Sequence, residues 1–96
     1  MDRFDCLSLA REAVTTRADT HGAPESNFER IAALWTIVLA GRLKDGATIA
    51  PTDVALCLDA VKTARLIQNP RHVDSWVDKA GYAACGMEIA SSGPAA

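Results

Sequence analysis

Apolar residues recur at helical spacing in four stretches of the chain, separated by short segments that contain glycine, proline and asparagine. The first stretch, residues 5–17, carries only a thin apolar stripe. In the second, the apolar side chains fill an arc of roughly 160° around a helix. That helix is expected to begin with Ser26 or Asn27 as its N-terminal cap and to end near Arg42. The pattern predicts one weakly amphipathic helix followed by a core helix.

Proline marks both ends of the third stretch. Pro51 stands where the first residue of a helix belongs. The helix is expected to stop at about Gln68, because Asn69 precedes a proline and such residues avoid the α region. A fourth helix is expected to begin near Val73 and to end before residues 91–96, a tail of small and polar residues that we expect to be disordered.

The composition favours an all-α protein. Of the 96 residues, 49% are apolar but only 5% are aromatic, and the excess of Ala, Leu, Val and Ile suits close helix packing. We therefore expect a single compact four-helix domain over residues 1–90. A chain of this length buries only a modest share of its surface, so we expect a homo-oligomer, a dimer or larger, that completes the core.

Net charge, cysteine positions and hydropathy limit the partners and the cellular compartment that we expect for the protein. The net charge of −2 provides no broad cationic field for a DNA or RNA backbone, so neither polymer is an expected partner. Cys6, Cys57 and Cys85 lie inside helical patterns and are expected to be small core residues in a reducing compartment. The longest apolar run, residues 31–41, falls short of the about 20 residues that cross a bilayer. No signal peptide is visible at the N-terminus, so we expect a cytoplasmic protein without a membrane partner.

The fourth helix carries the most informative polar pattern. Asp74, Asp78 and Tyr82 lie one turn apart and within roughly 80° of one another, on the edge of the apolar face. An edge of this kind can serve the core and a ligand together. The alternative interpretation is a capped, solvated or salt-bridged beginning of a helix.

The third helix places cations near its apolar arc. Arg65 projects within the arc and Lys62 lies about 60° away at its margin. A buried guanidinium needs a partner, because an unpaired buried charge costs several kcal/mol or more. The short connection between helices three and four makes them antiparallel neighbours, so Asp74 or Asp78 can supply that partner. The result is either a plain interhelical salt bridge or a mixed-charge pocket, whose cations meet phosphate while its carboxylates orient a metal, a base or a ribose.

The remaining candidates carry less information. His21, beside Gly22 in an expected loop, is either a surface residue or a ligand contact from a mobile lid. Trp35 and Trp76 are typical of core or interface anchors, with base stacking as the alternative. No zinc-protease helix motif, cysteine pair or Walker loop occurs, and no Ser or Cys lies at a nucleophile elbow. We therefore assign no catalytic and no metal-binding residue.

Several motifs along residues 15–90 together resemble a family of short proteins carried by tailed phages and prophages. They are His21-Gly22 with Pro24, Asn27 to Trp35, Pro51-x-Asp53-Val54, Lys62-x-x-Arg65-Leu66, and Asp74-Ser75-Trp76-x-Asp78 followed by Gly81-Tyr82-Ala83. The last of these is also similar to a phage domain associated with nucleotide modification. More distantly, it is similar to the all-α nucleotide pyrophosphohydrolases of the MazG and dUTPase type, which implies MazG-like helical packing.

The resemblance implies nucleotides as ligands. The distant relatives hold Mg²⁺ with acidic pairs on two helices, whereas this chain retains one pair, Asp74 and Asp78. We therefore expect a small-nucleotide-binding protein of the bacterial cytoplasm that sequesters a host defence second messenger, a nucleotide or cyclic nucleotide, without turnover or cofactor. The expected ligand-binding residues, in a pocket of helices two, three and four, are His21, Asn27, Trp35, Lys62, Arg65, Asp74, Asp78 and Tyr82.

Two alternatives remain. One is an enzyme, a Mg²⁺-dependent nucleotide pyrophosphohydrolase or a nucleotide-modification accessory, that uses Asp74 and Asp78. The other is a helical adaptor that binds a host protein and has no small ligand.

Overall fold

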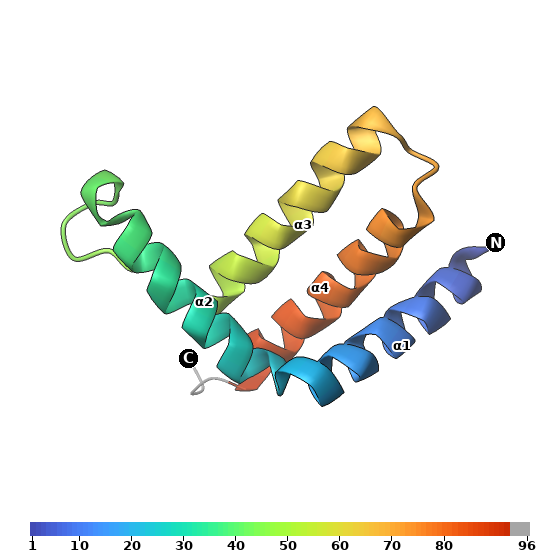
Figure 1. Cartoon of the computed structure of the whole chain (residues 1–96), viewed down its shortest axis with the longest axis horizontal. Coiled ribbons are helices and arrows are strands. Elements are labelled where there is room, and N and C mark those ends of the chain that lie inside the picture. Colours follow the sequence, from blue (N-terminus) through green and yellow to red (C-terminus); the bar gives the residue numbers. More distant parts are fainter. Residues whose placement is uncertain (93–96) are drawn as a thin grey trace.

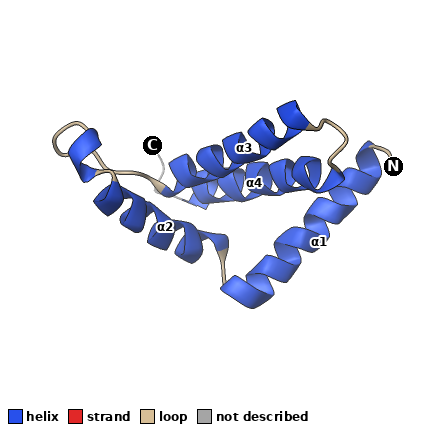
Figure 2. Cartoon of the chain, turned by 45° about the horizontal axis from the view of Figure 1, so that its top comes forward, coloured by secondary structure: helices blue, strands red, loops and turns tan. Residues whose placement is uncertain are grey.

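The computed structural model describes residues 1–92, with the side chain of His21 left out. Within these residues the chain forms four α-helices and no strand, which confirms the all-α, four-helix prediction (Figures 1 and 2). None of the helices described is long and apolar enough to cross a membrane. The elements are α1 (Arg3–His21), α2 (Pro24–Val38), the 3-10 turn η1 (Ala40–Arg42), α3 (Pro51–Gln68) and α4 (Val73–Ser92).

The helix α4 lies between its two partners. On one side it pairs with α3, to which a tight turn connects it, and on the other side it packs along α1. The chain directions in Figure 1 make α3 antiparallel to α4 and α1 roughly parallel to it. The helix α2 packs mainly against α3 and diverges from the other helices toward η1 (Figure 1).

The ends of α1 differ from the prediction. The helix begins at Arg3 rather than near residue 5, because the Asp2 carboxylate accepts hydrogen bonds from the backbone N–H groups of Phe4 and Asp5. It also continues through the expected loop to residue 21. There Gly22, at φ +82°, ends the helix in a backbone conformation that side chains other than glycine disfavour.

The beginning of α2 corrects a second expectation. Pro24 is the first helical residue and Ala23 precedes it without a side-chain cap, so Ser26 and Asn27 lie inside the first turns instead of capping them. The bounds of α3, from Pro51 to Gln68, agree with the prediction, as does the beginning of α4 at Val73. Ser91 and Ser92, expected in the tail, end α4, and residues 93–96 of the expected disordered tail lie outside the described residues.

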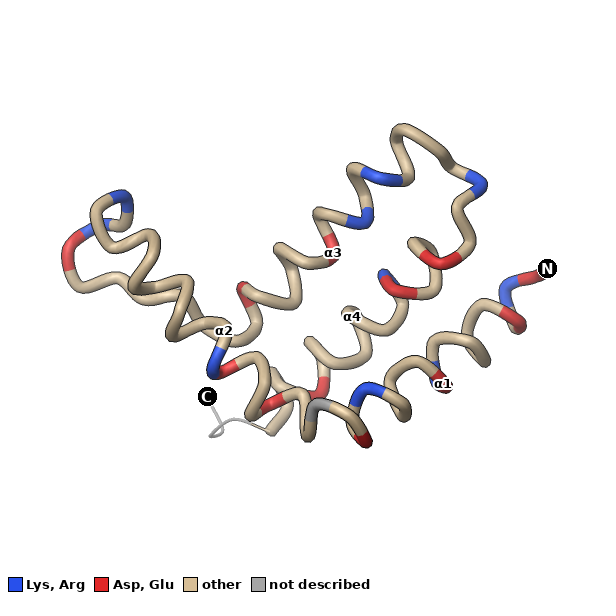
Figure 3. Tube along the Cα trace, viewed as in Figure 1, with Lys and Arg blue, Asp and Glu red and all other residues tan. Residues whose placement is uncertain are grey.

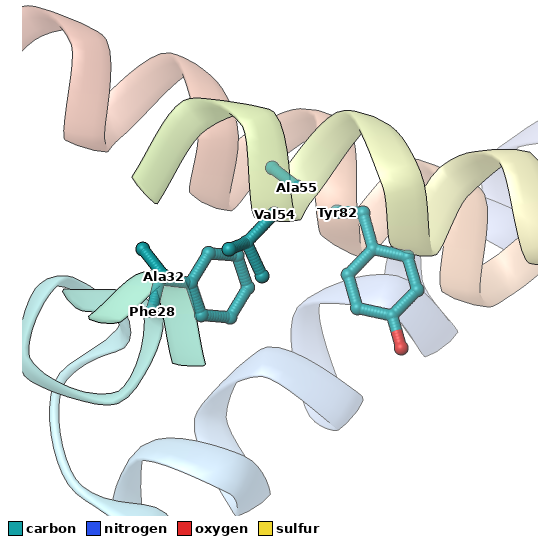
Figure 4. Close-up of a cluster of buried hydrophobic side chains, with 5 residues drawn as sticks. All are labelled: Phe28, Ala32, Val54, Ala55 and Tyr82. Carbon is teal, nitrogen blue, oxygen red and sulfur yellow. The ribbon is translucent and has the colours of Figure 1, made fainter. Parts of the chain in front are cut away.

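The core joins α2, α3 and α4 (Figure 4). Phe28 of α2 packs with Val54 of α3, which is completely buried, and with Tyr82 of α4. A β-carbon added at Gly86 would lie 3.2 Å from the Ala55 side chain, so a glycine here lets α3 and α4 approach closely. The remaining members of the buried cluster are Ala32 and Ala55, with Ile31, Trp35, Ile49, Leu58, Cys85 and Ile89 packed against it.

The cysteines do not all belong to this core. Cys6 and Cys85 are partly buried, whereas Cys57 is exposed. The prediction of a core position is therefore wrong for Cys57, because α3 turns a different face inward from the one expected. Trp35 is half-buried against the core, and Trp76 lies half-exposed with its indole N–H donating to the Pro70 carbonyl oxygen at 2.9 Å.

Candidate functional site

A cavity of about 350 Å³ lies between α1, the first turns of α2 and α4. Most of its wall is apolar, and the polar groups in it are few. The expected pocket used helices two, three and four, but α1 takes the place expected for α3. The lining residues are Ala13, Val14, Arg17, Ala18, Gly22, Pro24, Asn27, Phe28, Val77, Asp78, Gly81, Tyr82 and Cys85.

Asp78 links three helices at the edge of this cavity. One carboxylate oxygen lies 2.8 Å from the Lys62 ammonium of α3, and the other lies 3.8 Å from the Arg17 guanidinium of α1. The Lys62 side chain is 13% exposed and that of Asp78 is 19% exposed, so solvent screens this pair only weakly. Two cations around one carboxylate leave a local excess of positive charge.

Arg17 covers the aromatic ring of Tyr82. Its guanidinium carbon lies 5.2 Å from the centre of the ring, within the range of a cation–π interaction. The Tyr82 side chain raises the pKa of Arg17 above its ordinary value, against the lowering effect of burial, and the Asp78 carboxylate adds to the rise. The Tyr82 hydroxyl points toward α1 (Figure 4), while its ring closes the core beside Phe28. Tyr82 therefore belongs both to the core and to the cavity wall.

Three of the predicted site residues meet in the cavity, and Lys62 reaches it through Asp78. Asn27, Asp78 and Tyr82 line its wall. Gly22 also lines the wall, whereas the side chain of His21 lies outside the described residues, so its predicted role stays a prediction.

Three other predicted residues lie elsewhere. Arg65 is exposed, so the prediction that it is buried in an apolar arc is wrong, and Lys62 takes the expected place beside Asp78. Asp74 is exposed and outside the cavity, in a shallow groove that Glu12 also lines. Trp35 packs against the core and is absent from the lining.

Arg17 is the residue that the sequence reasoning missed. A signal for it exists, because Ala10, Val14 and Arg17 share one helical face of α1. Ala10 is buried and Val14 half-buried, so the guanidinium extends an inward-facing stripe. A cation that continues an apolar stripe is the feature that would have identified it.

The chain resembles known proteins through its sequence. Residues 5–90 match the family model described as a domain of unknown function, DUF6378. The chain belongs to the DUF6378 family. The gene 55 protein of Mycobacterium phage L5 is 41% identical over 78 residues, which cover 80% of this chain and 47% of the phage protein. The chain thus spans about half the length of that relative. No solved structure matches it significantly.

Family membership confirms the expected resemblance to a family of phage proteins. Family membership does not test the predicted nucleotide ligand, so we infer a ligand from the geometry of the cavity alone. Figure 3 shows acidic and basic residues interspersed along the described helices of this DUF6378 domain.

Cys85 brings a thiol to the cavity wall. Burial raises the pKa of this thiol above its ordinary value, and the nearby carboxylates of Glu88 and Glu25 raise it further, against the opposing charge of Arg17. The thiol is therefore protonated at neutral pH, and a protonated thiol is a poor nucleophile. Only the thiolate form of Cys85 would be a reactive nucleophile.

This raised pKa has a measurable consequence. In a competition for limiting iodoacetamide at pH 8, Cys85 is expected to react several-fold more slowly than the exposed Cys57. The Cys85 rate should rise as the pH passes its elevated pKa, because a raised value delays thiolate formation. Peptide mass spectrometry resolves the two rates. Equal rates at pH 8 would contradict the burial of Cys85.

Proposed function

We propose that this chain binds one small nucleotide in the cavity between α1, α2 and α4 and holds it chemically unchanged. Its role is then to sequester a nucleotide second messenger in the cytoplasm of the phage's host. One observation carries the proposal: a half-exposed guanidinium, Arg17, stands over the aromatic ring of Tyr82 at a cavity that is otherwise mainly apolar. A few convergent polar groups in an apolar pocket are typical of small-molecule sites.

The charge of the site favours a phosphate. Arg17 lies 3.8 Å from Asp78, which is long for a charge-assisted hydrogen bond, and Lys62 holds the other carboxylate oxygen at 2.8 Å. The guanidinium therefore has N–H donors to offer a ligand, and its planar fork matches the geometry of phosphate oxygens. Asp78 positions Arg17 and need not be displaced when the phosphate binds.

The remaining wall suits a base. Phe28, Val14 and Val77 give apolar surface, and the Asn27 amide offers both a donor and an acceptor to the polar edge of a base. The cavity volume of about 350 Å³ lies at the lower end of the range for small-molecule pockets, about 300–1,000 Å³. This size favours a mononucleotide over a cyclic dinucleotide.

The side chains support binding better than turnover. Asp78 is the one carboxylate in the described lining of the cavity, and both of its oxygens face cations. Metal-dependent hydrolysis of a nucleotide uses several carboxylates to hold Mg²⁺ on the phosphates. Among the described residues, no three His, Cys, Asp or Glu side chains gather into a possible metal site. Sequestration of a nucleotide requires high affinity and an abundant protein, but no catalytic group. The similarity to a phage protein is consistent with a ligand that the bacterial host makes.

The test is calorimetric titration of the purified chain with nucleoside monophosphates, cyclic mononucleotides and nucleoside triphosphates, in EDTA and then in Mg²⁺. We expect binding in both buffers. Arg17→Gln should weaken it about 10- to 100-fold, the loss expected for a charge-assisted hydrogen bond of about 1.5–3 kcal/mol. The matched control is Arg11→Gln, an exposed arginine on the same helix outside the cavity, which should bind like the wild type.

The outcomes separate the competing functions. Nucleotide recovered unchanged after the complex is heated supports sequestration. Pyrophosphate or a monophosphate released from nucleoside triphosphates only in Mg²⁺ would overturn the proposal in favour of the hydrolase. A chain that binds none of these nucleotides, and whose thermal transition they leave unmoved, would favour the adaptor, since a ligand at 100 times its Kd stabilises by about 2.7 kcal/mol.

A further inference from the structure

The helix α4 is apolar on two opposite sides. One side faces its own core and the cavity through Gly81, Tyr82 and Cys85. The opposite side carries six apolar residues with alternating spacings of three and four, which is the spacing of positions a and d in a coiled coil. We name this row the outer seam: Val73, Trp76, Ala80, Ala83, Met87 and Ala90.

Five of the six residues of the outer seam are exposed in the single chain, and Ala80 at its middle is half-buried. Val73 is 42% exposed, Trp76 48% and Met87 65%, and Ala83 and Ala90 are exposed as well. Beside it, Leu7 of α1 is 60% exposed and lines a groove together with four seam residues. The apolar face thus extends from α4 onto α1.

Charged groups border this face without interrupting it. Lys79 lies at its margin, where its ammonium is 2.9 Å from the Asp59 carboxylate of α3. No Asp, Glu, Lys or Arg lies within the outer seam itself. An apolar stripe on a helix normally faces a packing partner, and the outer seam is a second such stripe on α4.

We infer that the outer seam is the interface of a homodimer, in which α4 packs antiparallel against α4 of a second copy. Reversal of the seam places Trp76 opposite Met87 and Ala80 opposite Ala83. Large side chains then meet at the two ends, where sulfur can contact the indole, and small ones meet at the centre, where the helices approach closely. A two-fold axis near the middle of α4 makes the surface self-complementary, so a second copy is the occupant that its pattern fits.

The size of the face is sufficient for a dimer. From Val73 to Ala90 the helix rises about 25 Å, and with α1 alongside the face is about 20 Å wide. This area, roughly 500 Å² on each copy, gives a total of about 1,000 Å², the lower limit for a specific interface. In the antiparallel pairing Lys79 lies opposite Ala84, so the two Lys79 ammonium groups do not face each other. The cavity lies on the other side of α4 and stays open in the dimer.

Light scattering over a concentration series tests the interface. The wild type is expected to have twice the monomer mass of 10.2 kDa. Ala83→Glu places a carboxylate at the centre of each α4 and should weaken the dimer at least about a hundredfold, which gives monomers of unchanged helical content by circular dichroism. The matched control is Ala33→Glu, the same change at an exposed alanine of α2, beside the second exposed apolar patch at Leu34 and Ile37. It should remain a dimer.

Each other result contradicts the inference. A wild type that stays monomeric at every concentration would show that the outer seam does not bind a second copy, and would favour a different protein as its partner. A dimer that survives Ala83→Glu but is lost in Ala33→Glu would move the interface to α2. If Ala83→Glu unfolds, Met87→Lys at an exposed position nearer the end of the seam decides by the same measurement, and a persistent dimer there would also overturn the assignment. Titration of the monomeric variant with nucleotides tests the proposed function independently of the dimer, because the cavity lies on the other side of α4.

Discussion

Replacing Phe28 with alanine is expected to cost about 3–5 kcal/mol of the free energy of unfolding, the range measured for large aromatic residues in cores. Phe28 is 6% exposed and packs between Val54 and Tyr82, so its removal leaves a void that three helices border. A domain of this length is stable by only about 5–14 kcal/mol. The variant should therefore melt more than about 10 °C lower than the wild type.

The control for this variant is the chain's other phenylalanine. Phe4 is 62% exposed near the beginning of α1, so Phe4→Ala should change the free energy of unfolding by no more than about 0.5 kcal/mol. Urea denaturation at one protein concentration measures both variants. If Phe28→Ala were as mild as Phe4→Ala, the packing of α2 against α3 and α4 would be wrong.

Asp78→Asn is expected to cost about 2 kcal/mol of the free energy of unfolding, because it leaves the mostly buried Lys62 ammonium without its carboxylate. It also removes the anion that positions Arg17. The matched control is Asp74→Asn, one turn earlier on the same face of α4, where the carboxylate is exposed. That change should stay within about 0.5 kcal/mol. Thermal and urea unfolding measure the two values.

A double-mutant cycle sharpens this second prediction. Lys62→Met in the Asp78→Asn background removes the unpaired charge and should restore part of the lost stability, since deleting both partners costs less than deleting one. Independent, additive effects of the two substitutions would show that the Lys62–Asp78 contact does not contribute to folding.

Helix bounds that depend on local backbone effects can be predicted from the sequence more readily than the orientation of a helix face, which depends on tertiary packing. The bounds of α3 follow from Pro51 and Pro70, whose rings act on the local backbone whatever packs around it. Ser26 and Asn27 are residues that favour a helix cap and so predict a later beginning for α2, yet Pro24 begins the helix before them. A proline that acts on the local backbone therefore decides both the bounds of α3 and the beginning of α2.

Tertiary packing accounts for the remaining differences. The helix α3 is apolar on more than one face, so periodicity alone does not fix which face turns inward. It predicts an inward Arg65, whereas the structure turns Lys62 and Leu66 inward. The polar stripe of α4 predicted Asp78 and Tyr82 correctly as neighbours, because one helix holds both. Arg17 comes from a helix about 60 residues away in sequence. Its contact with Tyr82 depends on how α1 packs along α4, which no local pattern specifies.

The parallel arrangement of α1 beside α4 has a consequence for synthesis. The wall of the cavity combines residues near the beginning of the chain with Asp78, Tyr82 and Cys85 near its end. While a ribosome still holds α4 in its exit tunnel, the emerged part of the chain has only half of this wall, and Arg17 has neither the ring nor the carboxylate that orient it. A chain interrupted before α4 therefore lacks Asp78, Tyr82 and Cys85, so the binding site that we propose for this cavity is incomplete in it.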